Sequence, residues 1–297
     1  MTPKLSIIVC TYNRSFWLRN CLRSLEQSCA DGSEVEVLIV DNNSSDDTKT
    51  VAAEYMARLR NFRYVLETAQ GLSHARNRGF TEARGKYVAY IDDDAQAHAD
   101  WVPAIIRFFE TTPQASGVGG PYEGFSTIEI PPWFPKEMTC RSLGNETREI
   151  RDGEWINGTN MVFRKTALEQ VGGFDTGLGM VGDKVSYGEE TNLVLRMKAL
   201  GMLVYYCADM VVDHAVLPYK ISLWWLLKSR FANGYDGVKT FGRRFNVITF
   251  LPYLMRQLAI AVACLAVSRE PYFKARIYQS FSRLFWHLGY FVRLMKS

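Results

Sequence analysis

The chain has 297 residues, 47% of them hydrophobic, and a formal net charge of +4 at pH 7. This length and composition predict one large domain, or one and a half, with a sizeable core. The six cysteines are scattered without a Cys-x-x-Cys pair, which argues against a zinc site or a disulfide framework and favours reduced core thiols of a cytosolic protein. The first apolar run, residues 5–10, is too short for a signal peptide, and we expect none.

The charge is unevenly spread along the chain. Residues 220–297 contain 13 lysines and arginines but only 2 acidic residues, which leaves a net charge of −7 on residues 1–219. An acidic body with a basic tail is typical of a protein whose tail binds an anionic surface.

The first hundred residues alternate between strand-like and helix-like segments. The strand-like segments are residues 5–10, 35–40, 62–66 and 87–91, and the helix-like segments between them are residues 16–27, 48–59 and 73–83. We expect Asp47 or Thr48 to cap the second helix. Because strands separated by such helices are joined by right-handed crossovers, the pattern predicts an α/β fold with a mostly parallel sheet.

Three aspartates, Asp92, Asp93 and Asp94, directly follow the fourth expected strand. Adjacent carboxylates repel one another, so the arrangement is stable only if they face water or share a cation. Carboxylate oxygens suit Mg²⁺ or Mn²⁺, which usually bind through one or two carboxylates plus substrate phosphates. A solvated acidic turn is the alternative for an isolated run of three aspartates; polar residues at the other strand ends favour a metal site here.

Polar residues also follow the other expected strands, where ligands of open α/β sheets bind. Together they offer an aromatic ring, hydrogen-bond acceptors and a cation, which a nucleoside diphosphate needs, although ordinary turn chemistry is the alternative for Thr11 and Asp41. The alternating first hundred residues contain no Gly-x-Gly-x-x-Gly motif and no phosphate-binding Gly-x-x-x-x-Gly-Lys loop. The polar residues that we expect at these strand ends are Thr11, Tyr12 and Asn13, then Asp41, Asn42, Asn43 and Ser44, then Ser73, Arg76 and Asn77.

Eight motifs, in order from residue 5 to residue 214, resemble those of family 2 glycosyltransferases with the GT-A fold. They are residues 5–14 (LSIIVCTYNR), 40–48 (VDNNSSDDT), 71–79 (GLSHARNRG), 87–94 (YVAYIDDD), 157–161 (NGTNM), 172–175 (GGFD), 188–193 (GEETNL) and His214. The resemblance implies a mostly parallel sheet flanked by helices, with a C-terminal helical extension outside the family pattern. It also implies an inverting, metal-dependent enzyme that moves a sugar from a nucleoside-diphosphate donor, expected to be a UDP-sugar, to a hydroxyl of a cell-surface glycan or a lipid-linked saccharide.

The resemblance assigns roles on the donor side. Thr11, Tyr12 and Asp41 are expected to hold the base and the ribose. Asp92 and Asp94 form the Asp-x-Asp motif, with Asp94 as the more direct ligand of Mn²⁺ or Mg²⁺, a Lewis acid that would stabilise the charge of the leaving diphosphate. The other expected donor contacts are Asn13, Arg14, Asn43, Arg76 and Asp93.

The resemblance places the general base at the second residue of an acidic pair, Glu189 and Glu190, and therefore at Glu190. The family usually has an aspartate there, and also at Asn192, for which no role is expected. Inverting transfer needs one base for the acceptor proton, and the neighbouring Glu189 is expected to raise the pKa of Glu190. From the residues alone, acidic side chains in a first helical turn are better explained by the helix dipole, and it is the resemblance that favours the base.

The remaining candidates are less specific. His214 is expected to complete the metal or diphosphate shell, with a structural histidine as the alternative. The glycine-rich stretch 176–188 is expected to be a mobile loop. The other acceptor-side candidates are Trp133, Trp155, Asn157, Asn160 and Glu189, and a Trp-Phe pair such as 133–134 is as typical of a local core anchor as of a sugar platform.

We expect three parts: a donor-binding half at residues 1–115, an acceptor-binding half at 116–220, and a basic helical tail at 221–297. Apolar residues recur at three- and four-residue steps over 272–295 between basic ones, which predicts a helix in peripheral contact with an anionic membrane, with docking on the catalytic domain or a homodimer interface as alternatives. Residues 247–267 are apolar, but Pro252, Arg256 and Gln257 favour an interfacial helix over a membrane span. The expected location is cytoplasmic, at the inner face of the cell membrane, without a nucleic-acid partner.

Two other functions stay open. A sugar nucleotidyltransferase would share the sheet and the metal aspartates, but it would need a Gly/Arg/Lys-rich phosphate loop where Thr11, Tyr12 and Asn13 stand. A non-catalytic glycan- or membrane-binding module is the third possibility, if Glu190 is not a base. Hydrolysis of UDP-sugars with Mn²⁺ separates the three.

Overall fold

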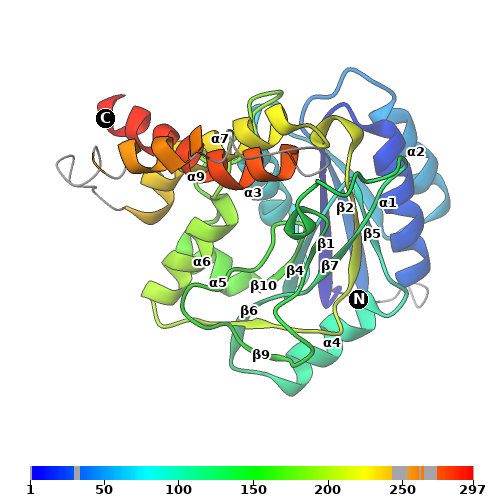
Figure 1. The fold of residues 1–297 in the computed structure, drawn as a ribbon. Coiled ribbons are helices and arrows are strands. Elements are labelled where there is room, and N and C mark those ends of the chain that lie inside the picture. Colours follow the sequence, from blue (N-terminus) through cyan, green and yellow to red (C-terminus); the bar gives the residue numbers. More distant parts are fainter. Residues whose placement is uncertain are drawn as a thin grey trace. The chain divides into compact units, whose positions relative to one another are not determined.

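The computed structural model describes residues 2–29, 34–242, 252, 254–260, 262–263 and 273–296. The chain divides into two compact units. Unit 1 comprises residues 1–125, 140–177 and 189–215, and unit 2 comprises residues 126–139, 178–188 and 216–297. Unit 1 holds the two sheets, and unit 2 holds the long C-terminal helices (Figure 1).

Unit 1 is built on an eight-stranded sheet in the order β3-β2-β1-β4-β10-β6-β11-β9. Its first four strands run parallel, as predicted: β1 (Leu5–Thr11), β2 (Val35–Asp41), β3 (Phe62–Leu66) and β4 (Tyr87–Asp92). The other four are β6 (Ala115–Gly119), β9 (Arg148–Glu149), β10 (Asn160–Arg164) and β11 (Leu203–Tyr206). β10 lies antiparallel between β4 and β6, so the sheet is mixed.

Helices cover both faces of this sheet, which explains why its central strands are continuous apolar runs. Ile7 and Val9 point to one face and Ile8 to the other, each into a separate core cluster. One face packs on α1 (Ser15–Ser28), α2 (Thr48–Arg58) and α4 (Trp101–Thr111). The opposite face packs on α3 (Leu72–Glu82), α5 (Lys165–Val171) and α6 (Glu189–Ala199).

The predicted cap of α2 is wrong in one detail. The side chain of Asp47 makes no capping hydrogen bond. Asp46 makes the hydrogen bonds at the start of the helix instead. Its Oδ1 accepts from the backbone N–H and the hydroxyl of Thr48 at 3.1 and 2.6 Å.

A second, four-stranded sheet has the order β5-β12-β7-β8. Its strands are β5 (Ala95–Ala97), β7 (Tyr122–Phe125), β8 (Cys140–Arg141) and β12 (Val212–Ala215). β5 begins directly after Asp94 and pairs antiparallel with β12, which places His214 opposite Ala95. This pairing brings His214 to the aspartates from a distant part of the chain.

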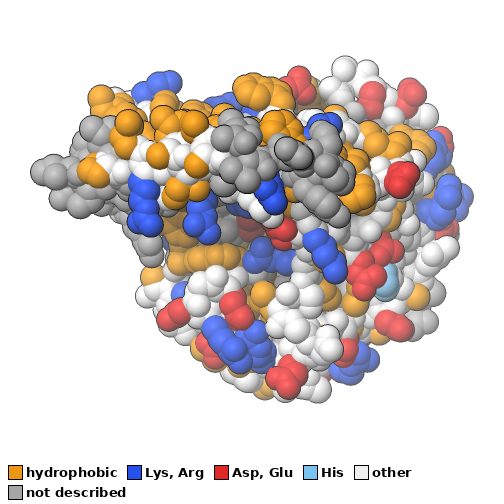
Figure 2. All heavy atoms as spheres, in the orientation of Figure 1, with side chains coloured by type: hydrophobic (Ala, Val, Ile, Leu, Met, Phe, Trp, Pro, Cys, Tyr) orange, Lys and Arg blue, Asp and Glu red, His pale blue; other side chains and the backbone are white. Residues whose placement is uncertain are grey.

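Unit 2 contains two long helices, α7 (Leu223–Phe241) and α9 (Phe273–Lys296), and two short 3₁₀ turns, η1 (Lys136–Met138) and η2 (Pro218–Lys220). α9 is the predicted tail helix, and it lies against α7 at very close range. A Cβ atom on Gly234 would stand 1.8 Å from the carbonyl oxygen of Trp286. Part of the apolar stripe of α9 is therefore covered by α7, while Figure 2 shows basic and hydrophobic side chains exposed along these helices.

Only part of the apolar stretch 247–267 can be compared with the structure, because residues 247–251, 253, 261 and 264–267 lie outside the described residues. Residues 254–260 are helical, as expected. Among the described residues, no helix has both the length and the apolar character that crossing a membrane requires.

Candidate active site

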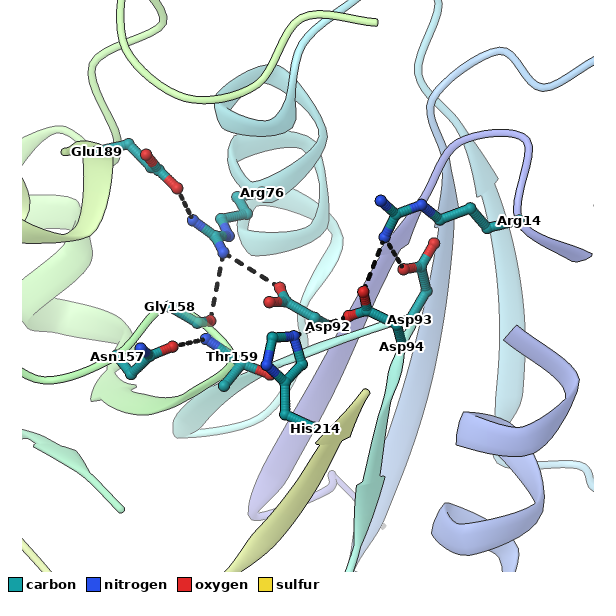
Figure 3. Close-up of polar contacts among 10 residues, drawn as sticks. All are labelled: Arg14, Arg76, Asp92, Asp93, Asp94, Asn157, Gly158, Thr159, Glu189 and His214. Carbon is teal, nitrogen blue, oxygen red and sulfur yellow. Dashed lines mark hydrogen bonds and ion pairs between the residues drawn. The ribbon is translucent and has the colours of Figure 1, made fainter. Parts of the chain in front are cut away.

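The three aspartates lie at the carboxyl end of β4, and the guanidinium of Arg14 contacts two of them (Figure 3). Asp93 and Asp94 are buried, and they share the guanidinium of Arg14, whose Nη1 lies 3.2 Å from Asp93 Oδ1 and 3.1 Å from Asp94 Oδ2. Arg14 precedes α1, directly after the loop that follows β1. Of the two arrangements expected for adjacent carboxylates, the structure has the shared cation for this pair.

The buried pair is electrostatically strained. Burial raises the pKa of Asp93 to about 6; the Arg14 charge opposes this rise and the Asp94 carboxylate adds to it. Because the pair holds negative charge in a place poor in water, it favours an additional cation.

His214 completes a candidate metal-binding set. Its Nε2 lies 3.1 Å from Asp94 Oδ1. One ligand atom each from Asp92, Asp94 and His214 lies within 4.8 Å of the others. Two carboxylates and one imidazole fit Mn²⁺ well and Mg²⁺ acceptably, with room for phosphate oxygens as the remaining ligands.

Arg76, one turn into α3, connects this set to the acidic pair of α6. Its side chain is only 3% exposed. Nη1 donates to Glu189 Oε1 at 2.7 Å, and Nη2 donates to Asp92 Oδ1 at 3.4 Å and to the carbonyl of Gly158 at 3.3 Å (Figure 3). A Cβ atom at residue 158 would stand 2.9 Å from Nη2, so the glycine leaves room for the guanidinium.

The two glutamates that open α6 differ in environment. Glu189 is buried and paired with Arg76. Burial and then the Glu189 charge raise the pKa of Glu190, against the opposing charge of Arg76, to about 8. A carboxyl that gains a proton near neutral pH suits general-base catalysis.

Comparison with known proteins decides the family. The family model described as "Glycosyl transferase family 2" matches residues 6–172, more than half of the chain. The chain belongs to glycosyl transferase family 2. Its named relatives are glycosyltransferases, and so is this enzyme.

One relative and two solved structures illustrate the likeness. The family 2 enzyme is 28% identical over 241 residues to the glucosyl-dolichyl phosphate glucuronosyltransferase of Haloferax volcanii, which covers 78% of this chain and 76% of the relative. Its fold is similar to the mannosyltransferase PcManGT from Pyrobaculum calidifontis in complex with GDP-Man and Mn²⁺ (TM-score 0.64, 18% identity, 100% of this chain and 88% of that one). S. aureus TarS 1–349 in complex with UDP-GlcNAc is also similar (TM-score 0.58, 17% identity, 99% and 91%). These neighbours confirm the GT-A fold.

The donor-side residues of the glycosyltransferase at β1 and β2 form a connected network. Asp41 accepts from the backbone N–H of Ser44 and from the hydroxyl of Tyr64, both at 2.8 Å. Asn13 has a left-handed backbone (φ 53°), and its Oδ1 accepts from the N–H of Ser45 at 2.7 Å. The bond from Ser44 is turn chemistry, the alternative expected for Asp41, whereas the bonds to Tyr64 and from Ser45 to Asn13 join segments far apart in the sequence. The role of Asp41 in base binding stays a prediction.

Three further donor candidates border this network. Thr11 is buried at the end of β1, Tyr12 is half-buried beside it, and Asn43 is exposed with a left-handed backbone (φ 66°). Tyr64, the partner of Asp41, was missed by the sequence reading, because its place within a strand gives no sign that its hydroxyl reaches a neighbouring strand end.

The acceptor-side candidates of the glycosyltransferase lie in different local environments. Asn160 is fully buried; its amide donates to the carbonyls of Pro121 and Met210 and accepts from Trp101, contacts that fit a structural role, and its contact with an acceptor stays a prediction. Asn157 forms a local turn by accepting from the N–H of Thr159 at 3.0 Å.

The two tryptophan candidates lie in different units. Trp155 is half-buried in unit 1, where its carbonyl accepts from Arg141 at 3.0 Å. Trp133 belongs to unit 2, where it contacts Phe134 and has the Lys274 ammonium 5.5 Å from its ring centroid. The local-anchor alternative therefore describes the contacts of Trp133.

Proposed function

We propose that this enzyme is an inverting, metal-dependent glycosyltransferase that moves a sugar from a nucleoside-diphosphate donor, a UDP-sugar, to a hydroxyl of a lipid-linked saccharide or cell-surface glycan. One observation carries the proposal. A candidate metal set, Asp92, Asp94 and His214, and a carboxyl with a raised pKa, Glu190, belong to the same compact unit, in which Arg76 donates both to Asp92 and to Glu189, the neighbour of Glu190.

The metal-binding role falls to Asp94, Asp92 and His214. When bound, a divalent cation would supply a Lewis acid for the negative charge of the leaving diphosphate. Asp94 offers one oxygen to Arg14 and the other to His214, so it is already oriented by two partners. Arg14, partly exposed, is placed to turn its charge from these carboxylates toward a bound diphosphate.

The donor assignment rests on the strand-end residues and on similar proteins. Thr11, Tyr12, Asn13, Asp41 and Asn43 lie at the ends of the two strands that precede β4 in the sheet, where the base and ribose of a nucleotide would bind. The two structural neighbours are described as complexes with GDP-Man and UDP-GlcNAc, which supports a nucleotide sugar as the donor.

Glu190 is the proposed general base. The acceptor oxygen forms a bond to the anomeric carbon, the bond from that carbon to the diphosphate breaks, and the hydroxyl proton passes to the Glu190 carboxylate. Because attack comes from the side opposite the diphosphate, the configuration at the anomeric carbon inverts.

The proposed acceptor is lipid-linked, and the proposed location is the inner face of the cell membrane. The Haloferax volcanii relative is named for a glucosyl-dolichyl phosphate acceptor. Unit 2 adds an exposed apolar segment, with Met255 59% and Leu258 41% exposed, within the basic C-terminal region. Basic and apolar side chains together favour the surface of an anionic membrane.

A donor screen tests the proposed function. The full chain is incubated with UDP- and GDP-sugars, Mn²⁺ or Mg²⁺, and short lipid-linked saccharides, and the released nucleotide and the anomeric configuration of the product are measured. We expect release that depends on both the acceptor and the metal, with an inverted product. Full activity in EDTA, or a retained configuration, would contradict the proposal, and release of pyrophosphate from a nucleoside triphosphate would favour the nucleotidyltransferase.

A further inference from the structure

We propose that Arg76 is a positioning residue of the acceptor side: by holding Glu189 in an ion pair, it leaves Glu190 as the carboxylate that receives the acceptor proton. This differs from the donor contact expected of Arg76 from the sequence. The inference rests on the proposed function, because it takes Glu190 to be the base.

The donor nitrogens of Arg76 already have hydrogen-bond partners within the protein. Both terminal nitrogens donate to protein oxygens of Glu189, Asp92 and Gly158. The guanidinium carbon also lies 5.4 Å from the ring centroid of Phe174, a favourable distance for a cation above an aromatic face. A guanidinium held on several sides and 3% exposed is poorly placed to meet an incoming phosphate.

Moving Arg76 toward a phosphate would break its shortest ion pair. Glu189 is itself buried, with a side chain that is 8% exposed, and Arg76 Nη1 is 2.7 Å from its Oε1. A buried carboxylate that loses its arginine partner becomes an uncompensated charge, which strongly destabilises a fold. The pair is therefore expected to persist when the donor binds.

The ion pair gives the two glutamates different roles. The Glu189 oxygen that faces Arg76 is occupied by a charge-assisted hydrogen bond, which makes Glu189 a poor proton acceptor. Among the described residues, the ion pairs of this region include Glu189 but not Glu190. Glu190 instead shares a side-chain hydrogen bond with Glu189, which helps to raise its pKa. Because no ion pair holds Glu190 among the described residues, a hydroxyl can compete for it.

The charges around Glu190 predict opposite shifts for two substitutions. Burial and then Glu189 raise its pKa, and Arg76 lowers it. Removing the Glu189 charge in Glu189→Gln should lower the titration midpoint of Glu190, by roughly one pH unit for a neighbouring charge. Removing the Arg76 charge in Arg76→Gln should raise the midpoint of Glu190 by a similar amount. Arg76→Lys keeps the charge and should bring the midpoint back close to the wild-type value.

The test follows Glu190 itself in the full chain. The carboxyl ¹³C resonance of Glu190, assigned by its loss in Glu190→Gln, is titrated from pH 5 to 10 in the wild type and in the Arg76 and Glu189 variants. UDP affinity in the presence of Mn²⁺ is measured by calorimetry on the same samples. Arg63→Gln serves as the control, because Arg63 forms comparable ion pairs with Glu36 and Glu82 away from this site.

We expect the midpoint to move down in Glu189→Gln and up in Arg76→Gln, with UDP affinity within about threefold of wild type and no change in Arg63→Gln. An unmoved midpoint in both site variants overturns the inference, and so does a loss of UDP affinity of about tenfold in Arg76→Gln alone, which would make Arg76 a donor contact. If Arg76→Gln does not fold, Arg76→Lys and Glu189→Gln decide the question. A protein that cleaves no nucleotide sugar would refute the proposed function while the titration still judges the ion pair.

Discussion

Asp94 is the side chain on which the metal proposal depends most directly. It is buried between Arg14 and His214, so two partners hold its carboxylate in position and little of it contacts water. Such a carboxylate is a strong cation ligand once phosphate oxygens supply the remaining positions.

We predict that Asp94→Asn abolishes the Mn²⁺-dependent part of UDP binding, because the amide keeps the shape of the side chain and removes its charge. The expected loss is at least about 10- to 100-fold in metal affinity, the usual effect of changing even a residue that supports a ligand. Calorimetry with and without EDTA measures it. Asp209→Asn, an exposed aspartate, is the control, and an unchanged UDP affinity in Asp94→Asn would contradict the metal assignment.

Glu190 should make stability depend on pH. Burial raises its pKa from 4.5 to about 8, so between these values the folded protein keeps a proton that the unfolded chain has lost. The free energy of unfolding therefore falls as the pH rises through this window.

We predict that Glu190→Gln, which has no proton to lose there, gains stability relative to wild type as the pH rises from 5 to 9. The difference in Tm should grow by roughly 2–4 °C or more, because that is the shift expected for each kcal/mol in a domain of this kind. Thermal unfolding at pH 5, 7 and 9 measures the difference, with the exposed Glu169→Gln as the control. A difference that stays constant with pH would show that Glu190 is not buried in this way.

At the scale of single residues, the sequence predicted which side chains belong to the candidate site better than which side chains they contact. Asp92 and Asp94 were recognisable because they follow a strand. The ion pair between Arg76 and Glu189 was not, since it joins α3 to α6 and depends on how both pack on the sheet. No local pattern records such a contact.

At the scale of elements, the helices α7 and α9 depend on glycine. Gly234 and Gly237 lie on the same helix, but a Cβ atom at residue 234 would meet the backbone of Trp286 at 1.8 Å, whereas at residue 237 the nearest atom is a side-chain carbon at 3.3 Å. Backbone atoms cannot turn aside as a side chain can, so of these two glycines it is Gly234 that the close approach requires.

We predict that Gly234→Ala lowers Tm markedly, because the helices must separate, and that Gly237→Ala is close to neutral. An alanine normally gains about 1 kcal/mol of helix propensity over glycine, which gives the control a small compensating advantage. Thermal unfolding of the two variants, followed by circular dichroism, tests the contrast. Equal Tm values for both would mean that α7 and α9 do not pack in this way.

The elements themselves could be predicted where the pattern is local. β1 to β4 and α1 to α3 lie within two residues of their expected bounds, because each strand is a continuous apolar run and each helix has its own periodicity. Beyond these elements, β10 begins at Asn160, because Asn157 forms a turn just before it, with its carbonyl accepting from the N–H of Asn160.

The pairing of distant strands could not be predicted. The insertion of β10 between β4 and β6, and the whole second sheet, join segments that are far apart in the sequence. Without this pairing, His214 could be proposed for the metal site only by resemblance, because nothing local brings it to Asp94.

At the scale of the whole molecule, the basic C-terminal region predicts a measurable affinity for membranes. Met255 and Leu258 lie one helical turn apart and are both exposed, so they form a small apolar face in a region rich in lysine and arginine. We expect the full chain to sediment with vesicles that contain anionic lipid, and to be released by salt, because salt screens the charge attraction.

We predict that Met255→Asp with Leu258→Asp weakens this sedimentation several-fold, while Leu66→Asp with Leu200→Asp does not. The control pair removes equally exposed leucines from unit 1. Sedimentation with neutral and anionic vesicles at low and high salt gives the comparison. If the full chain ignores anionic vesicles at low salt, the membrane proposal is wrong and a dimer interface becomes the better explanation.

The position of β10 has a consequence for the order in which the protein is made. β4, which carries the aspartates, pairs with β1 on one side and with β10 on the other, and β10 ends at Arg164. A nascent chain that has just completed Asp94 therefore presents β4 as an unpaired apolar edge, a known template for aggregation. We expect a fragment ending at residue 150 to scatter light at concentrations where the full chain stays clear, because the strand that covers the second edge of β4 is synthesised after it.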